Sequence, residues 1–290
     1  MQMIPFDKRD GFIWINGSFE KWNDAKVHVL NHGLHYASCV FEGIRIYNGK
    51  IFKLDEHIYR LFKSASILDL KIPYSFEETC LCIEELVIKQ NVKNGYIRPV
   101  VWRGSEMMAI SAENASTNIA IACWEWPSYF SPERLLRGIK LTVAEWVRPS
   151  PKSAPTDSKA AGLYMICSLS KHKAEKKGFD DALMLDYRGY IAEATGANIF
   201  FVKDGQLFTP KPDCFLNGIT RQTVISIAKK NKIKVNEDYL DIKFLSNCNE
   251  AFLTGTAVEI SPVSSIDDYK FNDRTVTKKL IDEFKKEVLN

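Results

Sequence analysis

The chain has 290 residues, of which 46% are hydrophobic and 26% charged, a balance typical of globular proteins that bury sizeable cores. Its formal net charge of +3 is too small to favour nucleic acid as a partner. No apolar stretch approaches the roughly 20 residues of a membrane span, and the start lacks the apolar run of a secretory signal. The seven scattered cysteines are typical of reduced thiols, so we expect a cytoplasmic protein without nucleic-acid or membrane partners.

The first half of the chain is predicted to form a sheet with two helices. Strand pairs with Asn-Gly turns are expected in residues 11–22 and 38–54. Apolar residues at helical spacing predict a helix with Asp55 as its N-cap, and Ser75 with Glu78 is a capping-box signature for a second helix. Two further strands are expected at 95–104 and 117–126.

The second half is predicted to be richer in strands. A strand is expected in 139–150, a helix near 160–177, three β runs in 181–210, a helix opening at Thr220, strands in 250–263 and a terminal helix at 275–288. The sum is an α+β fold with a small N-terminal α/β domain at 1–125, an interdomain loop at 126–137 and a larger, β-rich C-terminal domain at 138–290.

Two short segments are suited to binding an anion through the backbone. Gly218, Ile219 and Thr220 open a predicted helix, where unpaired N–H groups and the helix dipole favour a phosphate. The Thr-Gly-Thr-Ala segment at 254–257 is a turn of small residues whose amides could form an anion-binding nest. Taken alone, each segment is more typical of a helix cap or a tight turn, so both interpretations stay open.

Five charged residues are candidates for chemistry. Lys159 stands among Ser, Ala and Gly, which leave room around its amine, and Glu193 follows a strand, where it could face a cavity or simply end the strand. Arg45 and Arg98 lie in apolar strands and need an acidic partner, which could be a ligand or an acid of the chain itself. Arg60 lies on an amphipathic helix, where an arginine is usually solvated.

The histidines do not predict a metal site. His32 and His35 are three residues apart with His28 nearby, but no acid or cysteine completes a ligand set at convincing spacing. Neither a nucleophile elbow nor a P-loop is present in the sequence. We therefore expect no metal.

Several segments together resemble the fold-type IV, pyridoxal-phosphate (PLP) dependent aminotransferases, specifically the bacterial branched-chain amino acid aminotransferases. They occur in the family's order over nearly the full length of the chain: KVHVLNHGLHYASCVFEGIRIY, YIRPVVWRG, SKAAGLY, EATGANIFFVKDGQLFTP, LNGITR and LTGTAVEISPV. The resemblance implies the two-domain α+β fold of the D-amino acid aminotransferase type.

The resemblance also implies how PLP would be bound. Lys159 would be the catalytic residue, bound covalently to PLP and then moving a proton as a neutral amine. Glu193 would face the pyridine nitrogen and keep it protonated, and Tyr164 would bind O3′ of the cofactor. The phosphate would be held by a set drawn from both halves of the chain: Arg60, Ile219, Thr220 and Thr256.

Substrate residues follow from the same resemblance. The α-carboxylate would be received by Tyr96, Thr256 and Ala257. An apolar pocket for the side chain would be lined by Phe41, Trp126, Tyr129 and, from a neighbouring subunit, Tyr36. Arg98 would meet the distal carboxylate of glutamate, and Arg45 would support the site from behind.

The implied reaction is a ping-pong transamination. The amino group of leucine, isoleucine or valine passes to PLP, and the pyridoxamine form then converts 2-oxoglutarate into glutamate. A site shared between subunits implies at least a homodimer, and a hexamer is an alternative. The partners are therefore small molecules and further copies of the chain.

Three alternatives stay open. A D-amino acid aminotransferase or a 4-amino-4-deoxychorismate lyase would keep Lys159 and Glu193 but should differ at Tyr36, Tyr96 and Arg98. A non-catalytic scaffold would have no need of the full cofactor set. The sequence also departs from the family pattern, because Ala197 replaces the second acid of E-G-x-G-E-N, and the loop at 103–110, whose counterpart covers a neighbouring active site, is rich in Met.

Overall fold

The computed structural model describes residues 4–126 and 132–289. The chain divides into two compact units, one of Met1–Pro127 with Ser158–Gly162 and the other of Ser128–Asp157 with Leu163–Asn290. The segment that carries Lys159 therefore belongs to the first unit, although the flanking chain belongs to the second. In the expected interdomain loop, residues 127–131 lie outside the described residues and Pro132–Arg137 form helix α4.

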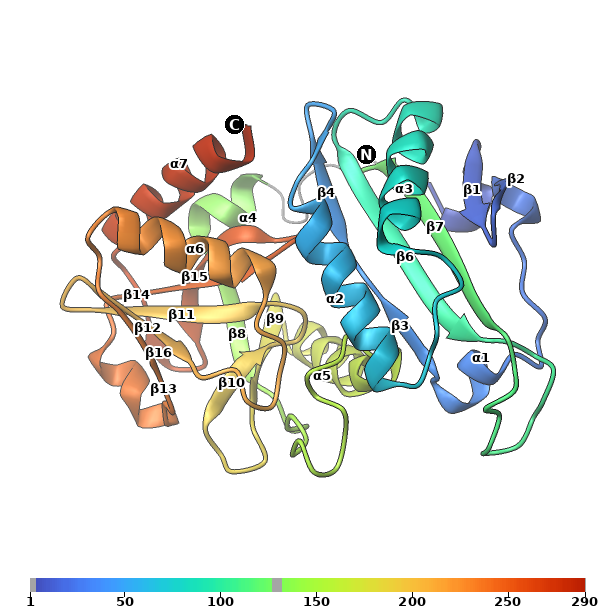
Figure 1. The fold of residues 1–290 in the computed structure, drawn as a ribbon. Helices are drawn as coiled ribbons and strands as arrows, with labels where there is room; N and C mark the ends of the chain where they lie inside the picture. The colour runs from blue at the N-terminus through green and yellow to red at the C-terminus, as the bar shows by residue number, and fades with distance from the viewer. Residues whose placement is uncertain (1–3, 127–131, 290) are drawn as a thin grey trace. The chain divides into compact units, whose positions relative to one another are not determined.

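The first unit is built on an antiparallel sheet (Figure 1). Its strand order is β2-β1-β7-β6-β4-β5, and β3 also pairs with β6. The bounds of these strands are β1 (Phe12–Ile15), β2 (Ser18–Lys21), β3 (Cys39–Phe41), β4 (Ile44–Tyr47), β5 (Lys50–Ile51), β6 (Gly95–Arg103) and β7 (Thr117–Glu125). The strand pairs and Asn-Gly turns expected from the sequence are confirmed, with Asn16 and Asn48 at positive φ.

Helices α2 and α3 pack against each other and on this sheet (Figure 1). Together they bury the apolar core of the first unit, which includes Ile58, Leu61, Ile83 and Leu86. The helices of this unit are η1 (Phe6–Lys8), η2 (Trp22–Asp24), α1 (His32–Tyr36), α2 (Leu54–Ile67) and α3 (Phe76–Gln90).

The sequence predicted the N-terminus of α3 correctly and that of α2 incorrectly. The capping box of α3 is confirmed, because the Ser75 hydroxyl accepts from Glu78 N at 3.1 Å and the Glu78 carboxylate accepts from Ser75 N at 2.7 Å. The expected N-cap of α2 is wrong. Lys53, in the left-handed conformation at φ 59°, precedes the helix, and Asp55 lies in the first turn, where its charge still complements the helix dipole.

The second unit has a mixed sheet with the strand order β10-β9-β8-β15-β14-β11-β12-β13, and β16 pairs with β15. Strand β8 is parallel to both β9 and β15, and β12 is parallel to β13. The bounds are β8 (Ile139–Val143), β9 (Asp181–Leu185), β10 (Ile191–Ala194), β11 (Asn198–Lys203), β12 (Gln206–Pro210), β13 (Val235–Asp238), β14 (Glu250–Gly255), β15 (Glu259–Ile266) and β16 (Tyr269–Lys270).

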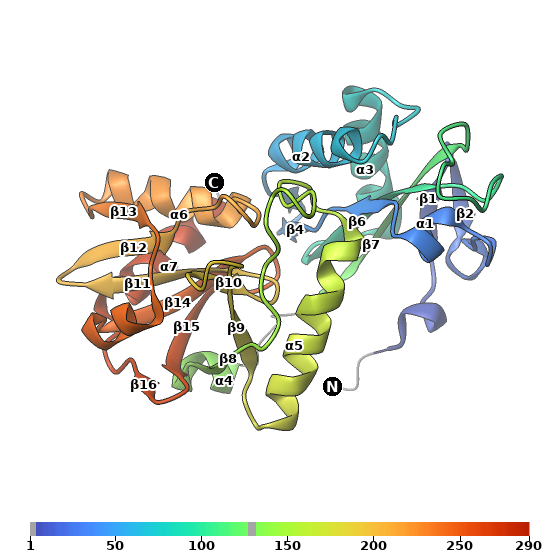
Figure 2. The ribbon, with the colours of Figure 1, turned by 90° about the horizontal axis from the view of Figure 1, so that it is seen from below.

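Helices pack on this sheet in two places. Figure 2 shows α5 alongside β9, and α6 and α7 pack against each other and on β14. The bounds are η3 (Ala161–Tyr164), α5 (Met165–Lys176), α6 (Ile219–Lys230), η4 (Ile242–Asn247) and α7 (Thr275–Leu289). Within the described ranges, the structure contains no helix with an apolar stretch long enough to cross a membrane.

Two sequence expectations for the second unit need correction. The three β runs expected in 181–210 are four strands, because a tight turn closed by Ala194 N donating to Ala197 O at 2.8 Å separates β10 from β11. Helix α6 begins at Ile219 rather than at Thr220, with Gly218 as its N-cap. Both differences lie beside residues that were singled out for cofactor binding.

Candidate active site

The backbone of Lys159 is anchored inside the first unit. Lys159 N donates to the buried Ser64 hydroxyl at 3.0 Å, and the Ser158 hydroxyl donates to Ser64 O at 3.2 Å. On the other side, Phe41 N donates to Lys159 O at 3.2 Å. The backbone of the lysine is thereby fixed between helix α2 and strand β3.

The Lys159 amine lies beside an aromatic ring and several charges. Its Nζ is 5.0 Å from the centroid of the Phe41 ring. Burial and the charge of Arg60 lower the pKa of Lys159 to about 8, while the charge of Glu42 opposes this shift. An amine with this pKa is neutral in about a tenth of molecules at pH 7, far more often than an ordinary lysine, and only the neutral form can act as a proton-transfer base.

Arg60 does not have the solvated side chain that is usual for an arginine on such a helix. Its Nε and one terminal nitrogen donate to the two carboxylate oxygens of Glu42 at 2.6 and 2.9 Å. The Glu42 side chain is fully buried, and it also receives Nδ1 of His57 at 2.7 Å. Burial alone would raise the pKa of Glu42, but Arg60 and His57 outweigh it and hold that pKa well below its usual range.

The sheet of the first unit carries a second set of candidate residues. Ile97, Ile121 and Cys123 point into the core with α2 and α3. Because side chains alternate along a strand, the intervening residues lie on the other face of the sheet. They include Tyr96, Arg98 and Trp124. Trp126, which directly follows β7, lies against the rings of Tyr96 and Trp124.

Aromatic rings surround the Arg98 guanidinium on that face. Its carbon lies 4.7 Å from the Phe41 ring centroid and 5.5 Å from that of Tyr96. The buried Nε of Arg98 has no hydrogen-bond partner among the described residues. A buried donor without an acceptor is costly, so this position is suited to an anionic ligand.

Two neighbours complete this face. Gly43 has no room for a side chain, because a Cβ at this position would overlap the Tyr96 hydroxyl. Arg45 is buried opposite Tyr96 in the β4–β6 pair, and its guanidinium lies 5.2 Å from the Tyr47 ring centroid. The first unit therefore brings together Lys159, Arg60, Tyr96, Arg98 and Phe41.

In the second unit, Glu193 on β10 is held by two residues that the sequence did not assign to a role. Asn198 Nδ2 donates to Glu193 Oε2 at 3.1 Å, and Arg148 Nε lies 3.5 Å from Glu193 Oε1. Burial alone would lower the pKa of Arg148, but Glu193 raises it above its ordinary value. Asn198 ends the E-x-x-x-x-N pattern, which was a usable signal. Arg148 lies beyond β8, in an isolated bridge with Asp186, where no sequence motif marks it.

Arg148 also connects Glu193 to the segment of Tyr164. It donates to Leu163 O at 3.4 Å and to the Cys167 sulfur at 3.5 Å. Tyr164 ends η3, directly before α5, and is half-buried. Glu193 and the Tyr164 segment are thus tied to one buried guanidinium.

The start of α6 is built around the same asparagine. Asn198 Nδ2 donates to Leu216 O at 3.0 Å, and its Oδ1 accepts from Gly218 N at 3.1 Å. Gly218 has no side chain that could cap the helix, so the N–H groups of the first turn, at Ile219 and Thr220, depend on another acceptor. An anion is the acceptor that the helix dipole favours.

Thr256 and Ala257 lie in the turn between β14 and β15. Gly255 pairs with Glu259 across this turn, which leaves residues 256–258 as its tip. Both candidate residues are half-buried. The second unit therefore contains Tyr164, Glu193, the α6 N-terminus and this turn.

The remaining candidates are Tyr36, Trp126 and Tyr129. Tyr36 ends α1 and is 43% exposed, with its ring 4.6 Å from that of His32. The two ring nitrogens of His32 meet the Ser38 hydroxyl at 2.6 Å and Ala109 O at 3.0 Å. Trp126 lies 5.8 Å from Tyr96 between ring centroids. Tyr129 lies outside the described residues.

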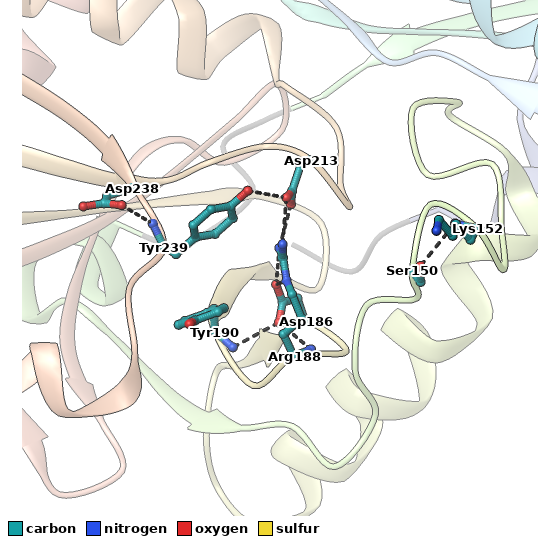
Figure 3. A network of polar contacts seen from close by, with 8 residues as sticks. All are labelled: Ser150, Lys152, Asp186, Arg188, Tyr190, Asp213, Asp238 and Tyr239. Carbon is teal, nitrogen blue, oxygen red and sulfur yellow. Dashed lines mark hydrogen bonds and ion pairs between the residues drawn. The ribbon is translucent and has the colours of Figure 1, made fainter.

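A separate polar cluster in the second unit surrounds Arg188 (Figure 3). The ligand atoms of Asp186, Asp213 and Cys214 lie within 4.8 Å of one another. The Arg188 guanidinium donates to Asp186 at 2.6 Å and to Asp213 at 2.9 Å, and the Tyr239 hydroxyl also donates to Asp213, at 2.8 Å. The positive charge that these carboxylates need is therefore supplied by the chain itself.

The chain is similar to known proteins over most of its length. Residues 39–266 match the family described as amino-transferase class IV. A probable branched-chain-amino-acid aminotransferase of Rickettsia felis (strain ATCC VR-1525 / URRWXCal2) is 47% identical over 289 residues, which cover 98% of each chain.

Two solved structures are similar over almost the whole fold. One is the branched-chain amino acid aminotransferase of Escherichia coli, at a TM-score of 0.92 and 38% identity, covering 96% of this chain and 94% of that one. The other is a T.th. branched-chain amino acid aminotransferase with pyridoxamine 5'-phosphate, at a TM-score of 0.93 and 36% identity, with coverage of 97% and 94%. These likenesses confirm the α+β, two-domain fold expected from the sequence.

The lowered pKa of Lys159 predicts a specific titration. In the protein stripped of cofactor, we expect modification of Lys159 by an amine reagent to reach half its maximal rate near pH 8, because burial and Arg60 lower the pKa to about 8 from the ordinary 10.5. Peptide mapping across pH measures it, and Lys286, whose pKa is raised by Glu283, is the internal control. A Lys159 profile that rises together with that of Lys286 would contradict the assigned environment.

Proposed function

We propose, from the premise that the chain belongs to the class IV aminotransferase family, that it transfers the amino group between L-leucine, L-isoleucine or L-valine and 2-oxoglutarate. It is a PLP-dependent transaminase, and the resemblance identified from its sequence is confirmed. The observation that carries the substrate assignment is Arg98 among the rings of Phe41 and Tyr96. Aromatic rings suit an aliphatic side chain, and an arginine among them suits the distal carboxylate of glutamate.

The residues present fit the cofactor. When bound, PLP supplies a ring that withdraws electrons from the substrate Cα and carries the amino group between donor and acceptor. Lys159 would bind it covalently and then, as a neutral amine, move the proton that leaves Cα. The lowered pKa of Lys159 supports both roles, because only a neutral amine can attack a carbonyl carbon or accept a proton.

Glu193 would pair with the protonated pyridine nitrogen. Its contacts with Arg148 and Asn198 support this role, because they hold the carboxylate in one orientation. Tyr164 would donate to or accept from the phenolic O3′ of the cofactor. The link from Arg148 to Leu163 O supports a common placement of Glu193 and Tyr164.

The phosphate would be held by charge and by backbone groups. Arg60 supplies a guanidinium whose plane is set by Glu42. Ile219 and Thr220 supply the first-turn N–H groups of α6, and Thr256 supplies the tip of the β14–β15 turn.

Substrate groups would meet the aromatic face and the turn. Tyr96, Thr256 and Ala257 would receive the α-carboxylate. Phe41, Trp126, Tyr129 and Tyr36 would surround the side chain, and Arg98 would bind the distal carboxylate of glutamate. The buried Nε of Arg98, which lacks a partner among the described residues, supports that last assignment.

We also propose that the enzyme works in the cytoplasm as a homodimer or a larger assembly such as a hexamer. Apolar side chains around α1 and the 103–110 loop are exposed, with Leu34 at 67% and Ile110 at 82%. A second copy of the chain would cover them and would place Tyr36 at a neighbouring site. The seven free thiols support a reducing compartment.

The proposed reaction is tested by single half-reactions. The PLP form is mixed with L-Leu, L-Ile, L-Val, L-Glu, L-Phe or D-Ala, and the absorbance of the cofactor is followed. We expect rapid conversion with the branched-chain amino acids and L-Glu, and none with D-Ala. Lys159→Ala should abolish conversion, because the proton-transfer base is missing. Turnover by Lys159→Ala at the wild-type rate, or a preference for D-Ala, would overturn the proposal.

Arg98→Ala should separate the two substrate classes. We expect the second-order rate constant for L-Glu to fall roughly 10- to 100-fold, because one charge-assisted hydrogen bond is lost. The constant for L-Leu should change by no more than about 3-fold, because an aliphatic side chain needs no cation. L-Leu is the control for general damage, and equal losses on both substrates would remove this role from Arg98.

Glu193→Gln should slow the chemical step without preventing cofactor binding. A neutral amide cannot stabilise a protonated pyridine nitrogen, so we expect the L-Leu half-reaction to slow by roughly 100-fold. Stopped-flow absorbance measures the rate. Glu287→Gln on α7, where Glu287 lies 3.7 Å from Lys230 at the surface, is the matched control. A wild-type rate in Glu193→Gln would exclude contact with the pyridine nitrogen.

A further inference from the structure

We infer that Glu42 is a positioning residue of the active site: it fixes the orientation of the Arg60 guanidinium for the cofactor phosphate and balances the charge of Arg60 beside Lys159. This inference rests on the proposed function, because it takes Arg60 as a phosphate ligand. Nothing in the motif analysis singled out Glu42, which stands in the Phe-Glu-Gly corner between β3 and β4.

The carboxylate of Glu42 is saturated with donors. Arg60 Nε donates to Oε1, while Oε2 receives the second Arg60 donor, Nδ1 of His57 and the N–H of Gly43, the last at 3.1 Å. The backbone of Glu42 is itself anchored, because its N–H donates to Pro99 O at 2.9 Å. A carboxylate offers about four acceptor positions, so these contacts leave it one orientation.

The burial of the Glu42 carboxylate calls for a functional explanation. Removing a carboxylate from water costs several kcal/mol, and well-packed apolar residues are often at least as stabilising as a buried ion pair. Arg60 has five N–H donors, and Glu42 takes two of them from one edge of the guanidinium. An arginine held in this way keeps its guanidinium in a fixed plane, whereas an arginine without such a partner loses side-chain entropy when it binds a phosphate.

Glu42 and Arg60 also influence the pKa of the Lys159 amine. The charged or titratable groups of the first unit that act on its amine are Arg60, Arg98, Glu42, Tyr96 and His57. Burial lowers the pKa of His57, which keeps that ring neutral beside Glu42. Glu42 is therefore the anion that offsets Arg60, and its removal leaves an uncompensated cation near the Lys159 amine.

Glu42→Gln is the sharpest substitution, because it keeps the shape and removes the charge. The amide oxygen can still accept from Arg60 Nε. The amide nitrogen, however, replaces the oxygen that now receives three donors, so the second bond to Arg60 is lost. The guanidinium gains freedom, while the fold loses no volume.

The test compares PLP with pyridoxal, which lacks the phosphate, as ligands of the cofactor-free protein. In Glu42→Gln we expect the Kd for PLP to rise about 10-fold or more, the loss of one charge-assisted hydrogen bond, and the Kd for pyridoxal to change less than about 2-fold. The pH midpoint of Lys159 modification should fall below that of the wild type. Glu56→Gln is the matched control on the same helix, because Glu56 pairs with Lys53 at the surface.

Further tests use Arg60→Gln, alone and combined with Glu42→Gln, and Glu42→Asp. In Arg60→Gln, adding Glu42→Gln should cause no further loss in the ratio of PLP to pyridoxal affinity, because Glu42 acts through Arg60. Glu42→Asp keeps the charge but shortens the side chain, so it should lower that ratio while the Lys159 midpoint stays near the wild-type value. If Glu42→Gln does not fold, Glu42→Asp carries the test by itself.

The outcomes separate this inference from the proposed function. Equal losses for PLP and pyridoxal, or a wild-type ratio in both Glu42 variants, would show that Glu42 only stabilises the fold and would overturn the inference. Transamination of L-Leu by the wild-type enzyme is measured in the same preparations. If the wild type fails to transaminate, the proposed function fails whatever the Glu42 variants do.

Discussion

The ion pair between the buried Glu42 carboxylate and Arg60 is the interaction on which the candidate site residues of the first unit depend. Glu42 accepts two hydrogen bonds from Arg60, and burial together with Arg60 lowers the pKa of the Lys159 amine. The roles that we propose require a positive charge for a phosphate and a neutral amine for proton transfer, and the two groups lie close together. A compensating anion allows both, because it limits the field of the arginine while the guanidinium stays in place.

The second unit also pairs an acid with an arginine, here Glu193 with the buried Arg148. Glu193 is half-buried, and Arg148 lies 3.5 Å from its carboxylate. Asn198 then joins this pair to the start of α6, since its amide contacts Glu193, Leu216 and Gly218. Glu193, which we propose as the partner of the pyridine nitrogen, and the proposed phosphate site at the start of α6 therefore share one positioning residue.

Much of this could be predicted from the sequence, and what could not has a physical reason. The Asn-Gly turns and the capping box of α3 are local, so a few neighbouring residues specify them. The small residues around Lys159 were visible, but their anchor at Ser64 lies 95 residues away in the chain. The start of α2 was missed because a left-handed Lys53, which no local rule favours, precedes it.

The residues that sequence analysis did not identify depend on contacts with distant parts of the chain. Glu42 and Arg148 act through partners distant in sequence, and each is an ordinary residue type in its local context. Asn198 contacts Glu193 within the E-x-x-x-x-N pattern, but its link to Gly218 at the start of α6 could not be read from the pattern. A carboxylate or guanidinium becomes informative only when burial shows that it must be paired. The Ala197 departure fits this view: the second acid of the family pattern is absent, yet Glu193 is still held by Asn198, at the end of the same pattern, and by the distant Arg148.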